Sequence, residues 1–274
     1  MFNLLIGIFI RIFSNSYLNV FQKLLTQKGE HPSIVNFYTY FGLTLIGILI
    51  CPHPLYTEGL WIDILTMGFL GATGNYFIIK ALSAGELSTL APINSYKPVI
   101  ALGISFLVLK EIPGIQEILG IFLIILGTLV LGGTKILCNK ATIYRFIALI
   151  LLGTEAVFIK KVIILTDINS TFLYWVATGL FCATIVCIFS KHQPKIKTAN
   201  IKYQLILITM VALMQYTTNY VFARMNVAYA LALFQLSTII SVFLGANIFK
   251  EKGLVKKLIA ASIMILGALL IILR

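Results

Sequence analysis

Residues 109–131 read LKEIPGIQEILGIFLIILGTLVL, and residues 249–271 read FKEKGLVKKLIAASIMILGALLI. Each stretch joins a Lys-Glu pair to an apolar run. At a constant offset of 140 residues, Ile125-Leu126-Gly127 falls on Ile265-Leu266-Gly267. Self-similarity of this kind marks a duplicated structural unit, so the second half of the chain is expected to repeat the first.

The composition around these stretches is that of a membrane protein. Of the 274 residues, 59% are hydrophobic and only 11% are charged, and a soluble globule could not cover such an interior with polar surface. Apolar stretches long enough to cross a bilayer as helices lie near 2–24, 33–51, 60–82, 86–109, 114–133, 143–165, 170–190, 201–223, 226–249 and 254–273. The sequence predicts an all-α polytopic protein with ten transmembrane helices, a multi-pass protein of the cytoplasmic or inner membrane.

The repeat extends beyond the quoted stretches. At an offset of 144 residues, Asn75-Tyr76 falls on Asn219-Tyr220. The two units are expected to be 1–133 and 134–274, each with five helices, in one integral membrane domain. Because five is an odd number, the second unit must enter the membrane in the opposite orientation. Inverted repeats are typical of secondary transporters, which bind their substrate near the bilayer midplane between the two units.

Several functional classes are excluded by what the sequence lacks. The four cysteines show no metal-ligand spacing, and His31, His53 and His192 all fall in connectors, so no metal site is expected. No glycine-rich phosphate-binding loop and no intramembrane enzyme signature are present. We therefore expect no enzyme activity, no cofactor and no nucleic-acid partner, and gradients as the energy source.

Three charged residues, Arg11, Lys97 and Glu155, lie near the middle of predicted spans, where each costs roughly 2.5–3.5 kcal/mol on insertion scales. Arg11 shares one helix face with Asn15 and Asn19, which predicts either a cavity wall or a packing seam. Lys97 follows Asn94 by one turn and can accept a carboxylate or phosphate. Two cations against one acid, Glu155, favour a substrate with an anionic group.

Glu155 has two open interpretations. As a lone carboxylate it is the candidate to carry a proton and couple transport to the proton gradient. Paired with Lys97 or Arg11, it would instead hold the helices together, and those two cations would then be structural as well.

Further polar and aromatic side chains in the spans are candidates to contact the substrate. The full predicted set is Lys97, Asn94, Tyr96, Arg11, Asn15, Glu155, Asn75, Tyr76, Trp175, Gln215, Asn219, Tyr220 and Gln235. Hydrogen bonding between helices is the alternative explanation for each of them. Gly68, Gly71 and Ala72 form a small-residue face that predicts close helix packing.

One set of residues forms a recognisable arrangement along the first half, namely Lys80 to Leu82, Pro98-Val99, Glu111, Gly120 and Gly127. In this arrangement the chain resembles a known family, the EamA-type transporters of the drug/metabolite transporter superfamily. The second half departs from the pattern, since Thr238 stands where a proline opposite Pro98 is expected. The resemblance implies ten helices as five plus five, a central cavity, and transport of amino acids or other small metabolites, commonly outward and sometimes coupled to protons.

Together these observations predict a secondary transporter that moves an amino acid or other carboxylate-bearing solute, by export or exchange, through alternating access. The alternatives are an exporter of cationic or lipophilic compounds, a flippase for lipid-linked substrates, and a membrane protein that transports nothing. The expected partners are the small-molecule substrate, membrane lipid and protons, and the chain could act as a monomer or a homodimer. The distribution of Lys and Arg over the connectors favours both termini outside, whereas the family resemblance implies both inside.

Overall fold

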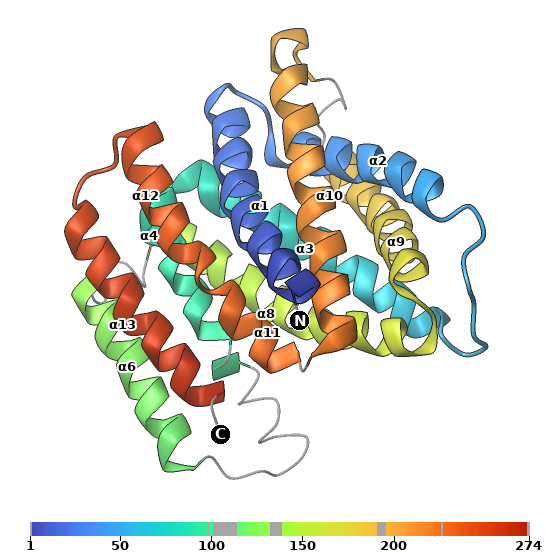
Figure 1. The fold of residues 1–274 in the computed structure, drawn as a ribbon. Coiled ribbons are helices and arrows are strands. Elements are labelled where there is room, and N and C mark those ends of the chain that lie inside the picture. The colour runs from blue at the N-terminus through green and yellow to red at the C-terminus, as the bar shows by residue number, and fades with distance from the viewer. Residues whose placement is uncertain are drawn as a thin grey trace.

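The computed structural model describes residues 2–97, 99–100, 114–131, 139–190, 196–225 and 227–272. Within those ranges all the regular elements are helices (Figure 1). In the first half they are α1 (Phe2–Gln27), α2 (Pro32–Ile50), α3 (Trp61–Ala84), α4 (Leu87–Leu90), the 3₁₀ helix η1 (Pro92–Tyr96) and α6 (Ile115–Leu131). In the second half they are α8 (Lys140–Leu165), α9 (Ile168–Phe189), η2 (Thr198–Asn200), α10 (Ile201–Arg224), α11 (Val227–Phe234), α12 (Ser237–Phe249) and α13 (Leu254–Ile272).

Five helices are long and apolar enough to cross a membrane by length and composition, namely α1, α2, α3, α9 and α10. The other five predicted spans differ from this pattern. The span 226–249 is divided between α11 and α12, and α8 carries five charged residues along its 26 positions. Of the span 86–109, residues 98 and 101–109 lie outside the described ranges, as do Pro98, Glu111 and Cys138.

The helix packing is symmetric under exchange of the two halves. Helix α1 packs on α10 and α3 packs on α8, so that the first and third helices of each half meet the third and first of the other. Helix α2 pairs with its counterpart α9, and α6 pairs with α13, side by side in Figure 1. The helices of the two halves are therefore interleaved in the part of the chain that the structure describes.

The fourth and ninth predicted spans are interrupted. In the first, Pro92 lies at the start of η1, where its missing N–H costs no helical hydrogen bond. In the second, α11 ends at Phe234 and α12 begins at Ser237, and Thr238 N donates to Gln235 O at 2.8 Å in a tighter 3₁₀-type turn. The break thus occurs just before Thr238, without a proline at that position.

Side chains of α1 satisfy the polar groups at this break. Asn15 Nδ2 donates to Ser237 Oγ at 2.9 Å, and Ser16 Oγ donates to the carbonyl oxygen of Ser237 at 2.9 Å. Interrupted backbone at membrane depth is tolerated where protein groups satisfy it or where it lines a cavity. The polar face of α1 therefore holds the broken helix of the opposite half in place.

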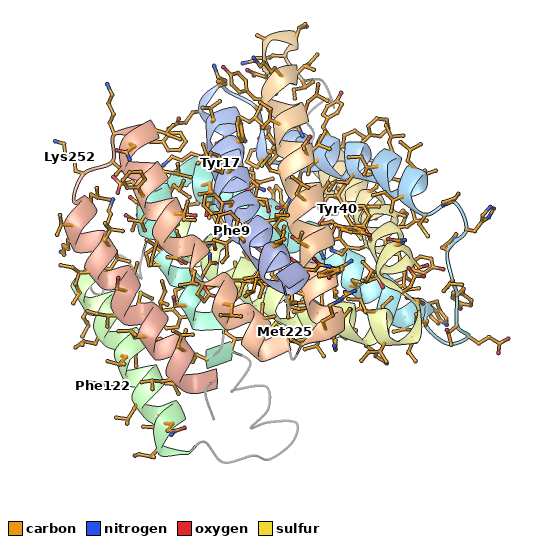
Figure 2. All side chains as sticks on the ribbon, viewed as in Figure 1. Phe9, Tyr17, Tyr40, Phe122, Met225 and Lys252 are labelled. Carbon is orange, nitrogen blue, oxygen red and sulfur yellow. The ribbon has the colours of Figure 1, made fainter. Side chains whose placement is uncertain are left out.

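A charged network joins the halves near the connector between α12 and α13. Lys23 Nζ of α1 lies 2.6 Å from Glu251 Oε1 and donates to the carbonyl oxygen of Gly85 at 2.9 Å. Glu251 also accepts hydrogen bonds from the backbone N–H groups of Leu87 and Ser88, each at 2.8 Å. These five residues are called the Lys23–Glu251 network below. In Figure 2 the labelled neighbour Lys252 locates this connector at one end of the helix bundle.

Large apolar side chains cover the outside of the bundle. Phe9, Leu49, Phe122 and Phe189 are 61%, 83%, 60% and 82% exposed, and Figure 2 shows Phe122 projecting away from the other helices. A soluble protein could not leave such a surface in water, whereas lipid tails solvate it.

Helix α9 begins at a side-chain cap. Asp167 Oδ1 accepts hydrogen bonds from the N–H groups of Asn169 and Ser170 at 2.7 and 2.9 Å, and Asp167 Oδ2 accepts from Ser170 Oγ at 2.6 Å. Burial raises the pKa of this carboxyl, but the hydrogen bonds outweigh that effect and hold the pKa below its ordinary value.

We expect Asp167→Ala to lower the free energy of unfolding by about 1–2 kcal/mol, because two N–H groups at the helix start lose their acceptor. Asp167→Asn keeps an acceptor oxygen and should lose less than half of that. Denaturant titration in mixed micelles measures both variants, and equal stability of Asp167→Ala and the wild type would refute the capping role.

Candidate functional site

A cavity of about 90 Å³ lies between the two halves. Helices α1 and α3 and the η1 segment contribute its wall from the first half, and α8, α9, α10 and α11 contribute from the second. Its polar lining residues within the described ranges are Arg11, Asn15, Asn19, Asn75, Asn94, Lys97, Arg145, Glu155, Trp175, Gln215, Thr218, Gln235 and Ser237. The volume suits a small solute, since pockets for drug-sized ligands measure roughly 300–1,000 Å³.

Arg11 projects from α1 toward α10 and α11. Its Nε donates to Thr218 Oγ1 at 2.6 Å, and its guanidinium carbon lies 4.5 Å from the centre of the Phe234 ring. Its Nη1 is buried and has no hydrogen-bond partner among the described residues. Two contacts therefore hold the Arg11 guanidinium group, one through Nε and one over its face. Its Nη1 remains available as a hydrogen-bond donor at the cavity.

Lys97, Asn94 and Arg145 form the second cationic region. The N–H of Lys97 donates to the Asn94 carbonyl oxygen at the end of η1, so both side chains leave the same turn. Arg145 Nη2 donates to Asn94 Oδ1 at 2.7 Å. The η1 segment of the first half and α8 of the second half thus meet at this hydrogen bond.

Arg145 is a site residue that sequence reasoning missed. It lies near the start of the predicted span 143–165 and is absent from the predicted set of site residues. The structure begins α8 at Lys140 and leaves Arg145 only 3% exposed in the cavity wall. The signal in the sequence is its helical spacing, because Arg145 shares one face of α8 with Leu152 and Glu155.

Glu155 of α8 and Trp175 of α9 form a hydrogen bond next to Gly71 of α3. Trp175 Nε1 donates to Glu155 Oε1 at 2.5 Å, and a Cβ at Gly71 would collide with both atoms. Only glycine therefore lets α3 come this close to the pair, which extends the small-residue face at Gly68, Gly71 and Ala72 into the site.

Glu155 has no ion-pair partner within 4.0 Å in the part of the chain that is described. The ion pairs found there join Lys23 to Glu251, Lys161 to Asp63 and Lys257 to Glu86. The charges of Lys97 and Arg11 still act on Glu155 through space. The direct salt bridge to either cation, which the sequence left open, is thus not formed in this conformation.

Uncharged polar groups line the rest of the cavity. A chain of hydrogen bonds runs from Gln22 Nε2 to Asn75 Oδ1 at 2.9 Å and from Asn75 Nδ2 to Asn36 Oδ1 at 2.8 Å, linking α1, α3 and α2. Gln215 Nε2 donates to Asn219 Oδ1 at 3.0 Å, and Gln235 Nε2 donates to the carbonyl oxygen of Leu231 at 3.0 Å. These bonds fix the amide orientations of the wall.

Four predicted site residues lie outside the described lining of the cavity. Tyr96 packs edge-on against Phe146, with ring centres 5.2 Å apart, and Tyr76 lies under the Lys80 ammonium. Tyr220 stacks beneath Arg224, and Asn219 accepts a hydrogen bond from Gln215 Nε2. The other nine predicted residues line the cavity together.

Among the residues that the structure describes, no group of three or more His, Cys, Asp and Glu side chains could hold a metal ion. The cavity offers cationic and amide donors, one carboxylate and one indole. Such a site can hold a small anionic or zwitterionic solute by charge and hydrogen bonds.

Comparison with known proteins identifies a family, a relative and a solved structure of similar fold. The profile of the EamA-like transporter family matches residues 3–133 and again residues 139–273. An uncharacterized protein of Methanocaldococcus jannaschii is 28% identical over 120 residues, which cover 41% of this chain and 83% of that protein. A crystal structure of a protein with 13% identity superposes with a TM-score of 0.67, covering 98% of this chain and 96% of the other, and shows a shared fold.

Proposed function

Because this chain belongs to the EamA-like transporter family, we propose that it is a secondary transporter for a small carboxylate-bearing metabolite. The observation that carries the proposal is the cavity between the halves, where Arg11, Lys97 and Arg145 supply positive charge. A buried charge is costly unless something compensates it, and a substrate carboxylate compensates these cations when it binds.

The transport cycle that we propose is alternating access by rocking of one five-helix unit against the other. Two features support it, namely packing that is symmetric under exchange of the halves and a cavity wall drawn from both halves. The proposal includes ten membrane spans as two inverted repeats, and movement of the solute by export or exchange. Gradients supply the energy.

Glu155 is the proposed proton carrier. It lies in the cavity wall, it has no ion pair within 4.0 Å among the described residues, and its one described hydrogen bond comes from Trp175. A carboxylate that is not held in a direct ion pair can gain and lose a proton as access alternates. We expect Glu155→Gln to bind substrate but to lose accumulation driven by a pH gradient.

Lys97→Ala tests the proposed substrate class. We expect alanine, glutamate or succinate to stabilise the purified wild type thermally, because a ligand of the native state raises its apparent stability. In Lys97→Ala the affinity should fall about ten- to hundredfold, the loss of a charge-assisted hydrogen bond. Lys252→Ala, at an exposed connector position, is the matched control and should behave as wild type.

The rival activity predicts the opposite pattern. If tetraphenylphosphonium stabilises the protein, Glu155→Gln abolishes that effect, and Lys97→Ala leaves it intact, the protein carries cations and the proposal fails.

A further inference from the structure

The cavity has more positive charge than a single carboxylate can neutralise. Within its described lining, three cationic side chains, Arg11, Lys97 and Arg145, face one acidic side chain, Glu155. With all four ionised the excess is two positive charges. The charges of both arginines and of Glu155 act on Lys97, so the four groups form one electrostatic site.

Arg145 has unused hydrogen-bonding capacity in that site. Its Nη2 is taken by Asn94, but its Nε and Nη1 are buried and have no partner in the described part of the chain. Buried polar atoms in native proteins are nearly always bonded, and those that are not call for an explanation. Nε and Nη1 lie on different edges of the guanidinium group, so each can donate a charge-assisted hydrogen bond to an oxygen of a carboxylate or phosphate.

Arg11 repeats this arrangement from the other half of the molecule. Thr218 takes its Nε and Phe234 covers one face, and Nη1 is left buried without a partner in the described ranges. Two guanidinium groups with spare donors, one on α1 and one on α8, therefore border the same small cavity.

We propose that the substrate is a dianion, a short dicarboxylate or a phosphate monoester, and that Arg145 holds its second negative charge. This inference rests on the proposed function and narrows its substrate class. A monocarboxylate leaves one positive charge in excess, and a zwitterion leaves both. A dianion of a few carbon atoms neutralises the site, fits the cavity of about 90 Å³, and supplies acceptors for the spare nitrogens.

The first test compares matched pairs of ligands on the wild type in lipid nanodiscs by isothermal titration. Succinate is paired with its monoamide succinamate, and methyl phosphate with dimethyl phosphate, so that each pair differs by one negative charge. We expect one of the dianions to bind about ten- to hundredfold more tightly than its monoanionic partner, the value of one charge-assisted interaction. The pair that shows the difference distinguishes a dicarboxylate from a phosphate ester.

The second test uses Arg145→Gln, which retains an amide near Asn94 but removes the charge. It should lose the preference for the dianion, because the affinity for the dianion should fall more than the affinity for the monoanion, whereas Arg145→Lys should recover part of the preference. Arg224→Gln is the control, because Arg224 is exposed and its described contacts are with the carbonyl oxygen and the ring of Tyr220. If Arg145→Gln does not fold, the ligand pairs on the wild type still decide.

The outcomes separate this inference from the proposed function. Equal affinity of the wild type for dianion and monoanion, or an undiminished dianion preference in Arg145→Gln, overturns the inference and leaves the carboxylate transporter standing. Binding of tetraphenylphosphonium without binding of any anion overturns both.

Discussion

Lys23→Met should lower the free energy of unfolding by about 3–5 kcal/mol, the cost of leaving a buried charge without its partner. The side chains of Lys23 and Glu251 are only 7% and 4% exposed. Without Lys23, the Glu251 carboxylate keeps the N–H groups of Leu87 and Ser88 but loses its counter-charge. Denaturant titration in mixed micelles measures the loss.

A neighbouring ion pair provides the matched control. Lys257 pairs with Glu86, whose side chain is 52% exposed, so water screens this pair. Glu86→Gln should cost no more than about 1 kcal/mol. The double variant Lys23→Met/Glu251→Gln should recover part of the loss, because it removes the orphaned charge. Equal effects of Lys23→Met and Glu86→Gln would contradict this account.

The same network gives a pH dependence. Burial opposes the charge of Glu251, but hydrogen bonds from Lys23 and Ser88 outweigh burial and hold its pKa below the ordinary 4.5. A lowered folded-state pKa stabilises the protein above the ordinary value, and that contribution disappears as the pH falls through the folded-state value. Wild-type stability should therefore decline below about pH 4.5, and Glu251→Gln should show a smaller decline.

Gly71→Ala is the second change with a large expected effect. The added methyl group would lie less than 3.0 Å from both Glu155 Oε1 and Trp175 Nε1, so this hydrogen-bonded pair or helix α3 would have to shift. Overpacking of this kind costs about 1–3 kcal/mol, and the lost bond to a carboxylate adds about 1.5–3 kcal/mol. Transport in proteoliposomes should fall at least about tenfold together with stability.

Gly153→Ala is the corresponding control on α8. The nearest neighbour of an added Cβ there is Ile100 Cγ2 at 3.9 Å, an ordinary van der Waals contact. This variant should retain wild-type stability and transport. If Gly71→Ala behaved in the same way, the close approach of α3 to the Glu155–Trp175 pair would have no functional role.

The sequence could predict the charged centre of the site because charge inside an apolar span is conspicuous. Arg11, Lys97 and Glu155 lie far apart in the chain, yet all three line one cavity. The sequence could not predict the distances between these three side chains. The cost of inserting a charge shows only that the charge avoids lipid, and it does not show which side chain the charge contacts. Glu155 forms no direct salt bridge among the described residues, and this depends on tertiary geometry that the sequence does not show.

The sequence could not show which of two adjacent residues lines the cavity. Asn75 and Tyr76 are adjacent and therefore project about 100° apart on a helix, so only Asn75 reaches the cavity. The repeated Asn-Tyr pair predicted contacts for both halves, but Asn219 is not among the described residues that line the cavity. Arg145 is the opposite case. It lies near the end of a predicted helix and is not predicted as a site residue, but it lines the cavity.

The hydrogen bond between Trp175 and Glu155 also gives the protein an optical reporter of its own. The chain has two tryptophans, and Trp61 is 57% exposed whereas Trp175 is 4% exposed in the cavity wall. Indole emission responds to the polarity and hydrogen bonding around the ring. In a Trp61→Phe background, the remaining tryptophan fluorescence would come from Trp175 in the cavity wall, so solute entry and protonation of Glu155 could be followed in real time without an attached dye.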